Sequence, residues 1–404
     1  MTDMNTLYCF YDMQVSPCSY DFFIFLYSAE ICRLNRGHKS IKLVLVKGPN
    51  FDFREDNLRT RSQNKTFFEN VILPGISLLP SCDSFMWLTR EEATLDLQKE
   101  QIFPKGYSIH KPTTGYLPHN LVASKIRQDE ISFFKAPQYA SAIADQFVNQ
   151  QIDDNAFVTL TIREIERDDF NSTRQINIDF WNNAIDRLSS LGLKTVLIRD
   201  TSMCFGEKML EGVIEAPVAS VHLPTRMALY DKAKLNLTKN NGPAILQLFG
   251  QSNCIYFNQF DENVVALSPK FYAMHYGMGL GSQFPMTATN KIVSWELDNS
   301  KTALKQIEAG LITSSKLEPN HTFHDEDNYF KTLNVGLRHL IHSLNFGTLK
   351  EDLFLFQALE SYNNKKKFLD DLVEFIASQR DNSLESHAFE EFHSKLKSNN
   401  HTGE

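Results

Sequence analysis

The sequence predicts an α/β protein of two doubly wound parallel-sheet domains followed by a helical C-terminal extension. Three observations lead to this fold class. The 404 residues exceed what one ordinary hydrophobic core needs, short apolar runs alternate with amphipathic segments in both halves, and the pattern becomes helical beyond Trp295. We expect residues 1–150 and 151–345 to form the two domains and residues 346–404 to form the extension.

The first half begins with a βαβ pattern. Leu7–Asp12 and Ile41–Val46 are apolar runs typical of buried parallel strands, and the apolar segment between them predicts a helix that ends at Gly37. Further along, we predict a strand over Val71–Leu79 and a helix over Phe85–Lys99. A helix from Ala136 to Gln150 completes this half, and the polar residues 151–155 mark the domain boundary.

The second half repeats the alternation of strands and helices. Gly192 ends an amphipathic helix, and apolar runs on both sides of it have the length of buried strands. We predict strands at Phe157–Ile162, Lys194–Ile198, Leu235–Thr238 and Cys254–Phe257, and helices at Ile176–Leu191, Arg226–Lys232, Gly242–Phe249 and Thr302–Gly310, with further helices beyond residue 327.

Composition excludes several classes of protein. Hydrophobic residues at 42% and charged residues at 22% are typical of a soluble globular chain, and the net charge of −8 argues against broad nucleic-acid binding. The six cysteines are scattered singly, so no zinc site or disulfide framework is predicted. The first residues lack a basic signal-peptide region, and no apolar run reaches the roughly 20 residues of a membrane span. We expect a cytoplasmic protein.

The most informative motif follows the strand Leu235–Thr238. It reads Asn240-Asn241-Gly242-Pro243-Ala244 and opens into a helix. Backbone N–H groups at such a helix start suit an anion, and in α/β domains a nucleotide diphosphate often lies there. The same residues also make an ordinary strand-to-helix turn, and both interpretations remain open here.

Charged residues follow the strand Phe157–Ile162. Arg163 comes directly after it, so its planar guanidinium is expected at the carboxyl edge of the sheet, where it can clamp a phosphate with Glu164 orienting it. Arg174 is a further donor-binding candidate in the polar segment downstream. A solvated loop is the alternative interpretation of this segment.

Two more candidates follow later strands of the second half. Asp200 ends the strand Lys194–Ile198 and can bind a ribose or a base edge, although Arg-Asp at a strand end is also common turn chemistry. Arg226 begins a predicted helix and is expected near the same rim as the Asn-Gly-Pro turn.

Acceptor-side candidates follow the first strand of the chain. Asp12 can act as a general base for an attacking hydroxyl, and Ser16 and Tyr20 lie just beyond it. His110, in a segment rich in Gly, Pro and aromatic residues, is a further candidate. Gln283 lies in a glycine-rich loop that lacks the strand and helix of a dinucleotide fingerprint, and it is a possible sugar contact.

The only basic run is Lys365-Lys366-Lys367. A solvated helix face is one interpretation, and docking on anionic lipid headgroups is the other. No metal-ligand spacing, P-loop lysine or nucleophile elbow is present in the sequence, so we expect neither a metal nor a cofactor.

Together these features resemble the two-domain bacterial glycosyltransferases of the GT-B type, which act in capsule and O-antigen polysaccharide synthesis. The resemblance lies in Thr159–Glu164, Asn171-Ser172, Trp181, Ala228-Leu229-Tyr230 and Asn240–Pro243, and more loosely in Pro17–Gly37. It implies two Rossmann-like domains, with the nucleotide sugar held by the C-terminal domain and the acceptor by the N-terminal domain. It also implies that the diphosphate lies between Arg163 and the turn Asn241–Ala244, and that the last helix crosses back to the first domain.

The expected function is metal-independent transfer of a sugar from a nucleotide-sugar donor to a hydroxyl of a glycan or lipid-linked acceptor, with peripheral contact at the inner membrane. The E-x-7-E pattern of many retaining relatives is missing, so the stereochemistry stays open. Two alternatives remain: a nucleotide-sugar epimerase or hydrolase on the same fold, and a non-catalytic sugar-binding or scaffold protein.

Overall fold

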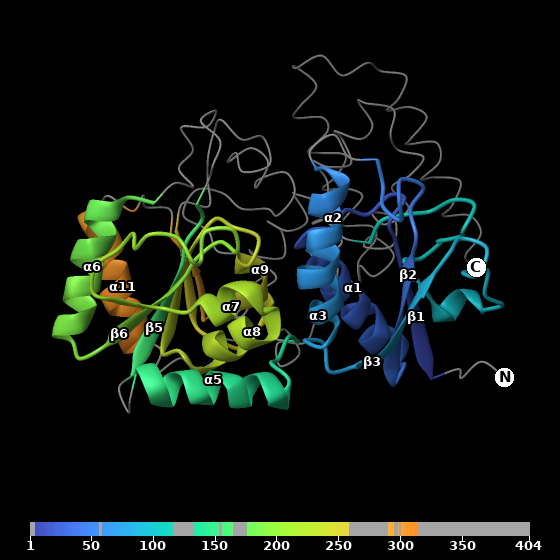
Figure 1. Cartoon of the computed structure of the whole chain (residues 1–404). Coiled ribbons are helices and arrows are strands. Elements are labelled where there is room, and N and C mark those ends of the chain that lie inside the picture. Colours follow the sequence, from blue (N-terminus) through green and yellow to red (C-terminus); the bar gives the residue numbers. More distant parts are fainter. Residues whose placement is uncertain are drawn as a thin grey trace, which may run out of the picture.

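The computed structural model describes residues 5–55, 59–115, 133–152, 156–164, 176–257, 290–294, 298 and 300–313. Within these residues the chain forms two parallel β-sheets that lie side by side (Figure 1). The predicted alternation of strands and helices in two doubly wound sheets is confirmed. Of the helical C-terminal part, α11 (Lys301–Thr313) is described, and residues 346–404 lie outside the described residues.

The first sheet has four parallel strands in the order β3-β2-β1-β4. Strands β1 (Thr6–Asp12) and β2 (Ser40–Val46) are joined by helix α1 (Asp21–Arg36), whose residues 22–31 are all buried. Gly37 ends α1 in the left-handed conformation with φ 71°, as its position in the sequence predicts. The outer strands are β3 (Cys82–Leu88) and β4 (Ile102–Phe103).

Two predicted elements of the first half are wrong. Val71–Leu79 was expected as a strand but is helical over most of its length, in the π-helical turn η1 (Phe68–Ile72) and α3 (Leu73–Ile76), which follow α2 (Arg61–Phe67). A short apolar run does not separate strand from buried helix, and Pro74 fits the first turn of α3. Conversely, the segment that begins the predicted helix Phe85–Lys99 is strand β3, because it pairs with β2. The 3₁₀ turn η2 (Lys99–Gln101) follows.

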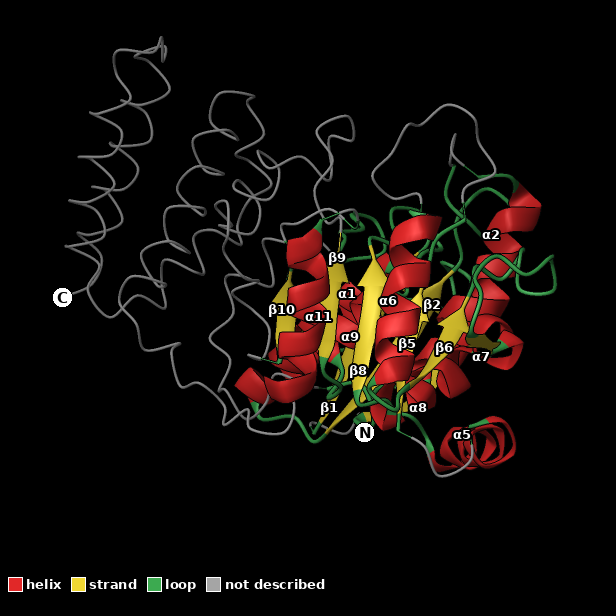
Figure 2. Cartoon of the chain, turned by 90° about the vertical axis from the view of Figure 1, so that its left-hand side faces the viewer, coloured by secondary structure: helices red, strands yellow, loops and turns green. Residues whose placement is uncertain are grey.

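The second sheet has six parallel strands in the order β10-β9-β8-β5-β6-β7. They are β5 (Phe157–Thr161), β6 (Lys194–Ile198), β7 (Val213–Glu215), β8 (Leu235–Lys239), β9 (Cys254–Phe257) and β10 (Lys291–Val293). Helices α6 (Ile178–Ser190) and α11 cover one face (Figure 2). On the other side lie α7 (Pro217–Val221), α8 (Leu223–Lys232) and α9 (Ala244–Phe249).

Helix α5 (Gln138–Gln151) follows the first sheet in the chain but packs against α8 of the second. Its Asp145 pairs with Lys232 at 2.6 Å. The segment that leads into α5 touches the second sheet as well, since the backbone N–H groups of Phe133 and Phe134 both donate to the carbonyl of Phe249, at 3.0 and 3.2 Å. The connection between the sheets is therefore itself hydrogen bonded to α9.

An aromatic seam joins the two sheets. The rings of Tyr27, on α1, and Phe249, on α9, stack with centroids 3.9 Å apart, and Phe134 packs edge-on against Phe249. One continuous cluster of buried side chains extends from the first sheet through α1 to α8 and α9. Burial of this apolar surface holds the sheets together at this seam.

We predict that Phe249→Ala lowers the free energy of unfolding by about 3–5 kcal/mol, the usual cost of removing a buried phenyl ring. The measurement is urea unfolding followed by far-UV circular dichroism. Phe205→Ala is the control, because Phe205 is 81% exposed in the same half of the chain and its loss should change stability by less than about 0.5 kcal/mol. Equal midpoints for the two variants would show that the seam does not hold the sheets together.

Candidate functional site

The second sheet has a topological switch point between β5 and β8. Its strand order is that of the six-stranded doubly wound fold, because the chain builds outward from β5 to β7 on one side and then from β8 to β10 on the other. In such sheets ligands bind outside the carboxyl ends of the strands at the point where the order reverses. Residues that follow β5, β6 and β8 are therefore the first candidates for a binding site.

Three groups of the predicted site residues lie at this edge. Arg163 and Glu164 follow β5, Asp200 follows β6 by one residue, and the Asn-Gly-Pro turn follows β8. The side chain of Asn241 connects two of these groups, since its Nδ2 donates to the carbonyl oxygen of Thr161 at 3.4 Å and to Thr238 Oγ1 at 3.3 Å.

The Asn240–Ala244 turn differs from the expected anion site. The backbone N–H of Ala244 donates to Asn241 Oδ1 at 2.9 Å, so the turn satisfies this donor itself, and α9 has only six residues. Pro243 is buried and has no N–H to offer, and Asn240 is also buried. The alternative that the sequence left open, a strand-to-helix turn, describes these residues better.

Gly242 has a packing role in this turn. A Cβ placed on it would lie 2.3 Å from Cδ2 of Tyr20, far inside van der Waals contact. Only glycine allows the Tyr20 ring, which directly precedes α1, to approach the end of β8 this closely. Tyr20 was predicted as an acceptor-side residue, and it brings the carboxyl edge of the first sheet against that of the second.

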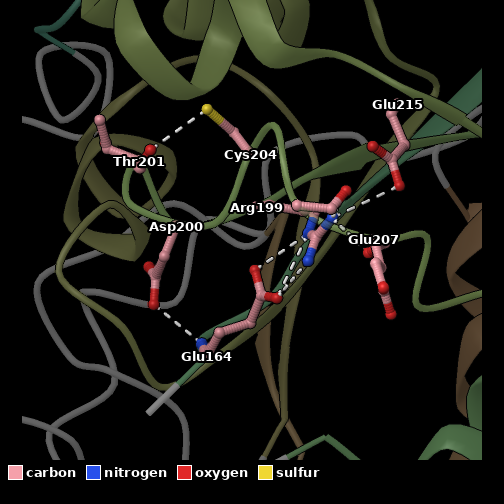
Figure 3. Close-up of polar contacts among 8 residues, drawn as sticks. Glu164, Arg199, Asp200, Thr201, Cys204, Glu207 and Glu215 are labelled. Atoms are coloured by element: carbon pink, nitrogen blue, oxygen red, sulfur yellow. Dashed lines mark hydrogen bonds and ion pairs between the residues drawn. The ribbon is translucent and has the colours of Figure 1, made fainter. Parts of the chain in front are cut away.

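Glu164 was predicted to bind the donor, and the structure instead gives it a buried partner. Its carboxylate accepts from Arg199 Nη2 at 2.7 Å and from Nε at 3.1 Å (Figure 3). The two side chains are only 5% and 3% exposed. Arg199 also donates to the carbonyl of Glu207 at 2.9 Å and lies 3.7 Å from Glu215. Glu164 is therefore a structural residue, and the prediction for it is wrong.

Arg199 is the residue at this edge that sequence reasoning missed. The sequence does contain a signal for this residue, because Arg199 comes directly after the apolar run of β6. A charged side chain at such a buried position needs a partner of opposite charge. The hydrogen bond of Arg199 to Glu164 raises the pKa of the guanidinium. The pair ties the end of β5 to the end of β6.

Asp200 and Arg163 are the remaining candidates at this edge, and both residues are half-buried. Asp200 Oδ2 accepts from the backbone N–H of Glu164 at 2.8 Å, which fixes its orientation (Figure 3). Burial raises the pKa of Asp200, opposed by this hydrogen bond and by the charges of Arg163 and Arg226. Burial lowers the pKa of Arg163, and the charge of Asp200 opposes that shift.

Arg226 is buried on α8 and held from behind. Its Nε donates to the carbonyl of Ala219 at 2.7 Å and its Nη2 to that of Ser220 at 3.2 Å. Its charge acts on both Asp200 and Tyr20. The structure thus brings together Arg163, Asp200, Arg226 and Tyr20, four of the predicted site residues from four segments of the chain.

The prediction for Asp12 is wrong. The side chain is 0% exposed, and both carboxylate oxygens accept from Arg90 Nη1 at 3.0 Å. The hydroxyl of Tyr107 at 2.9 Å and the backbone N–H of Gln14 at 2.9 Å complete its contacts. A carboxylate with these partners and no exposed surface has no access to an acceptor hydroxyl, so Asp12 is a structural anchor.

Two other acceptor-side predictions have different outcomes. Ser16 is buried, and its backbone N–H donates to the carbonyl of Asp12 at 2.8 Å, so it offers no exposed contact. His110 is exposed in a turn, and the carbonyl of its neighbour Ile109 accepts from Arg90. Arg174, Gln283 and Lys365–Lys367 lie outside the described residues.

The described part of the chain has neither a metal-binding cluster nor a membrane-spanning helix. No group of three or more His, Cys, Asp or Glu side chains there is placed to hold a metal ion. None of the helices there has the length and apolar character to cross a membrane.

No protein-family model matches the chain, and no curated protein matches it significantly. Among solved structures it is similar to ADP-heptose lipopolysaccharide heptosyltransferase II of E. coli, with 9% identity, a TM-score of 0.42 and coverage of 77% of this chain and 100% of the other. A family 9 glycosyl transferase from Veillonella parvula has 12% identity, a TM-score of 0.37 and coverage of 78% and 97%. A putative UDP-N-acetylglucosamine 2-epimerase from Listeria monocytogenes has 10% identity, a TM-score of 0.29 and coverage of 87% and 98%.

We predict that Asp200→Asn does not destabilise the protein at neutral pH. Because burial raises the folded-state pKa of Asp200, its ionised form opposes folding above that pKa, and asparagine removes the charge while its oxygen still accepts from Glu164. The variant should be at least as stable as the wild type at pH 7. Its advantage should vanish below about pH 4, where the wild-type aspartate is protonated in both states.

Urea unfolding at a series of pH values measures this difference. Asp145→Asn is the control, since Asp145 lies on the exposed side of α5 and pairs with Lys232. A loss of stability in Asp200→Asn that grows as the pH rises would contradict the assigned direction of the pKa shift.

Proposed function

We propose that the chain is a glycosyltransferase of the GT-B type that moves a sugar from a nucleotide-sugar donor to a hydroxyl of a glycan or lipid-linked acceptor. The observation that carries this proposal is the position of Arg163, Asp200 and Arg226 at the switch point of the second sheet, where Tyr20 of the first sheet packs against Gly242 at the end of β8. A carboxylate beside two guanidinium groups at such an edge suits a ligand that carries both phosphates and a sugar.

In this proposal the second sheet, in a domain of residues 151–345, holds the donor. Arg163 contacts the diphosphate, while the buried Arg226 adds positive charge from behind. Asp200, with its orientation fixed by the backbone of Glu164, accepts from ribose hydroxyls or a base edge. The same arginines stabilise the negative charge that develops on the departing phosphate.

The acceptor approaches from the first sheet, in a domain of residues 1–150. Tyr20 and the exposed His110 remain the acceptor-side candidates of the described residues, and Asp12 is not among them. Surface polysaccharide synthesis, a cytoplasmic location and contact with the inner membrane stay part of the proposal.

We predict that Arg163→Gln weakens donor binding about 10- to 100-fold, because a charge-assisted hydrogen bond contributes about 1.5–3 kcal/mol. The measurement is thermal stabilisation by a panel of ADP-, UDP-, GDP-, CDP- and dTDP-sugars, followed by titration with the best donor. Arg187→Gln is the matched control, since Arg187 lies on α6 and pairs with Glu308 away from the switch point. Unchanged donor affinity in Arg163→Gln would remove this site assignment.

The transfer step is proposed to need no metal, because Arg163 and Arg226 supply the positive charge. Turnover with the best donor should therefore be the same before and after treatment with EDTA. A loss of turnover that Mg²⁺ or Mn²⁺ restores would show that a metal takes part.

The alternative of a nucleotide-sugar epimerase or hydrolase uses the same donor site. Incubation with donor alone separates it, since an epimerase or hydrolase converts the donor without an acceptor. A scaffold protein would show no stabilisation by any member of the panel.

A further inference from the structure

A strained loop at the carboxyl end of β2 presents an aromatic ring to solvent. Phe51 and Asp52 have φ values of 51° and 76°, in the left-handed region that non-glycine residues rarely adopt. Bridges between Gly48 and Asp52 and between Asn50 and Phe53 hold this conformation. Phe51 is nevertheless 61% exposed, so burial of its ring does not offset the strain of this backbone conformation.

Cations stack on the aromatic rings around this loop. The guanidinium carbon of Arg61 lies 4.0 Å from the centroid of Phe51, and that of Arg59 lies 4.6 Å from the centroid of Phe67. Lys47 lies 4.7 Å from the ring of Trp87, which is itself 42% exposed. Stacking fixes the plane of each guanidinium, while its edge N–H groups remain able to donate to a ligand.

The two lysines near these arginines have acidic partners. Lys47 pairs with Asp52 at 3.4 Å, and Lys65 on α2 lies 3.8 Å from Glu69. Neither Arg59 nor Arg61 has a carboxylate partner among the residues that the structure describes. Arg59 Nη1 donates to the carbonyl of Cys18, at 3.1 Å. In a chain with a net charge of −8, two stacked guanidinium groups that have no carboxylate partner in the described part of the chain favour a bound anion.

These arginines lie on the acceptor side and close to the proposed site. Phe67, beneath Arg59, packs edge-on against Tyr20 with ring centroids 6.5 Å apart. Tyr20 in turn covers Gly242 at the end of β8. Arg59 is therefore separated from the switch point of the second sheet by two aromatic rings.

We propose that Arg59 and Arg61 bind a phosphate group carried by the acceptor, so that the acceptor is a phosphorylated glycan or a lipid-linked one. The planar forks of the guanidinium groups match phosphate oxygens in pairs. The exposed rings of Phe51 and Trp87 then contact the sugar or apolar part next to the phosphate. This inference rests on the proposed function, because it names the substrate class of the same enzyme.

The test measures acceptor-side binding without any donor. One arm titrates the protein with α-D-glucose 1-phosphate and, as a reference, glucose, by calorimetry. The other arm measures cosedimentation with phosphatidylcholine vesicles that contain or lack phosphatidylglycerol. The wild type is expected to bind in one arm in a phosphate-dependent manner, and the arm identifies whether the phosphate belongs to a soluble sugar or a lipid.

The double variant R59Q/R61Q is expected to bind at least about tenfold more weakly, and the matched control Lys65→Gln, on the same helix α2, should bind like the wild type. Phe51→Gly separates phosphate binding from a purely structural role of this loop, because it changes stability and binding in opposite directions. It relieves the left-handed backbone strain at residue 51 and also removes the ring on which Arg61 stacks. The melting temperature should therefore rise while phosphate binding weakens.

Three outcomes would overturn the proposal: no phosphate-dependent binding in either arm, an equal loss in R59Q/R61Q and Lys65→Gln, or a loss of nucleotide-sugar affinity in R59Q/R61Q as large as that in Arg163→Gln. The last outcome would place both arginines in the donor site. The donor panel on the same variants tests the proposed function separately. If the wild type binds a nucleotide sugar but R59Q/R61Q binds phosphate as well as the wild type does, only this inference is contradicted.

Discussion

The candidate site depends on the buried ion pair between Glu164 and Arg199. Glu164 is the third residue after β5 and Arg199 directly follows β6, so their contact at 2.7 Å fixes the carboxyl ends of two neighbouring strands relative to each other. The half-buried Arg163 and Asp200 are the immediate chain neighbours of this pair. Each therefore stands on a backbone whose position is set by a buried partner one residue away.

Burial of such a pair is expensive, because two charges leave water, and it is stable only when the remaining polar atoms are satisfied. Arg199 meets this condition with carbonyl groups as well as carboxylates. Asp200 adds a further tie through the N–H of Glu164. The same polar network that lowers the cost of burial thus orders the edge at which a ligand would bind, which is the kind of support a preorganised site needs.

A second constraint comes from the first sheet. Tyr20 lies against Gly242, and behind it the stacked rings of Tyr27 and Phe249 join α1 to α9. The carboxyl edges of the two sheets are therefore in contact through glycine and aromatic residues. Arg59 is linked to this contact, because it stacks on Phe67 and Phe67 packs edge-on against Tyr20.

The sequence predicted the strands and long helices of the second half well, because their apolar periods are long and glycine marks their ends. The prediction was wrong at Val71–Leu79, because a short apolar run fits a buried strand and a buried helix equally well. It was also wrong at β3, where pairing with β2 makes the segment a strand. For the site residues, the sequence showed which chemical groups follow the strands, but it did not show which of those side chains are buried in ion pairs. Asp12 and Glu164 have the composition of catalytic or binding groups, but their partners Arg90 and Arg199 lie 78 and 35 residues away.

Only the fold brings such partners together, and the partner decides the role. An acidic side chain at the end of a parallel strand can contact a ligand if it is exposed to solvent. It has a structural role if it is buried in an ion pair with an arginine. Arg163 and Glu164 show this difference in adjacent positions, since successive side chains at a strand end point to opposite sides. Arg59 and Arg61 are recognised by the same reasoning, because within the described residues they stack on aromatic rings and have no carboxylate partner, which leaves their charge available to a ligand.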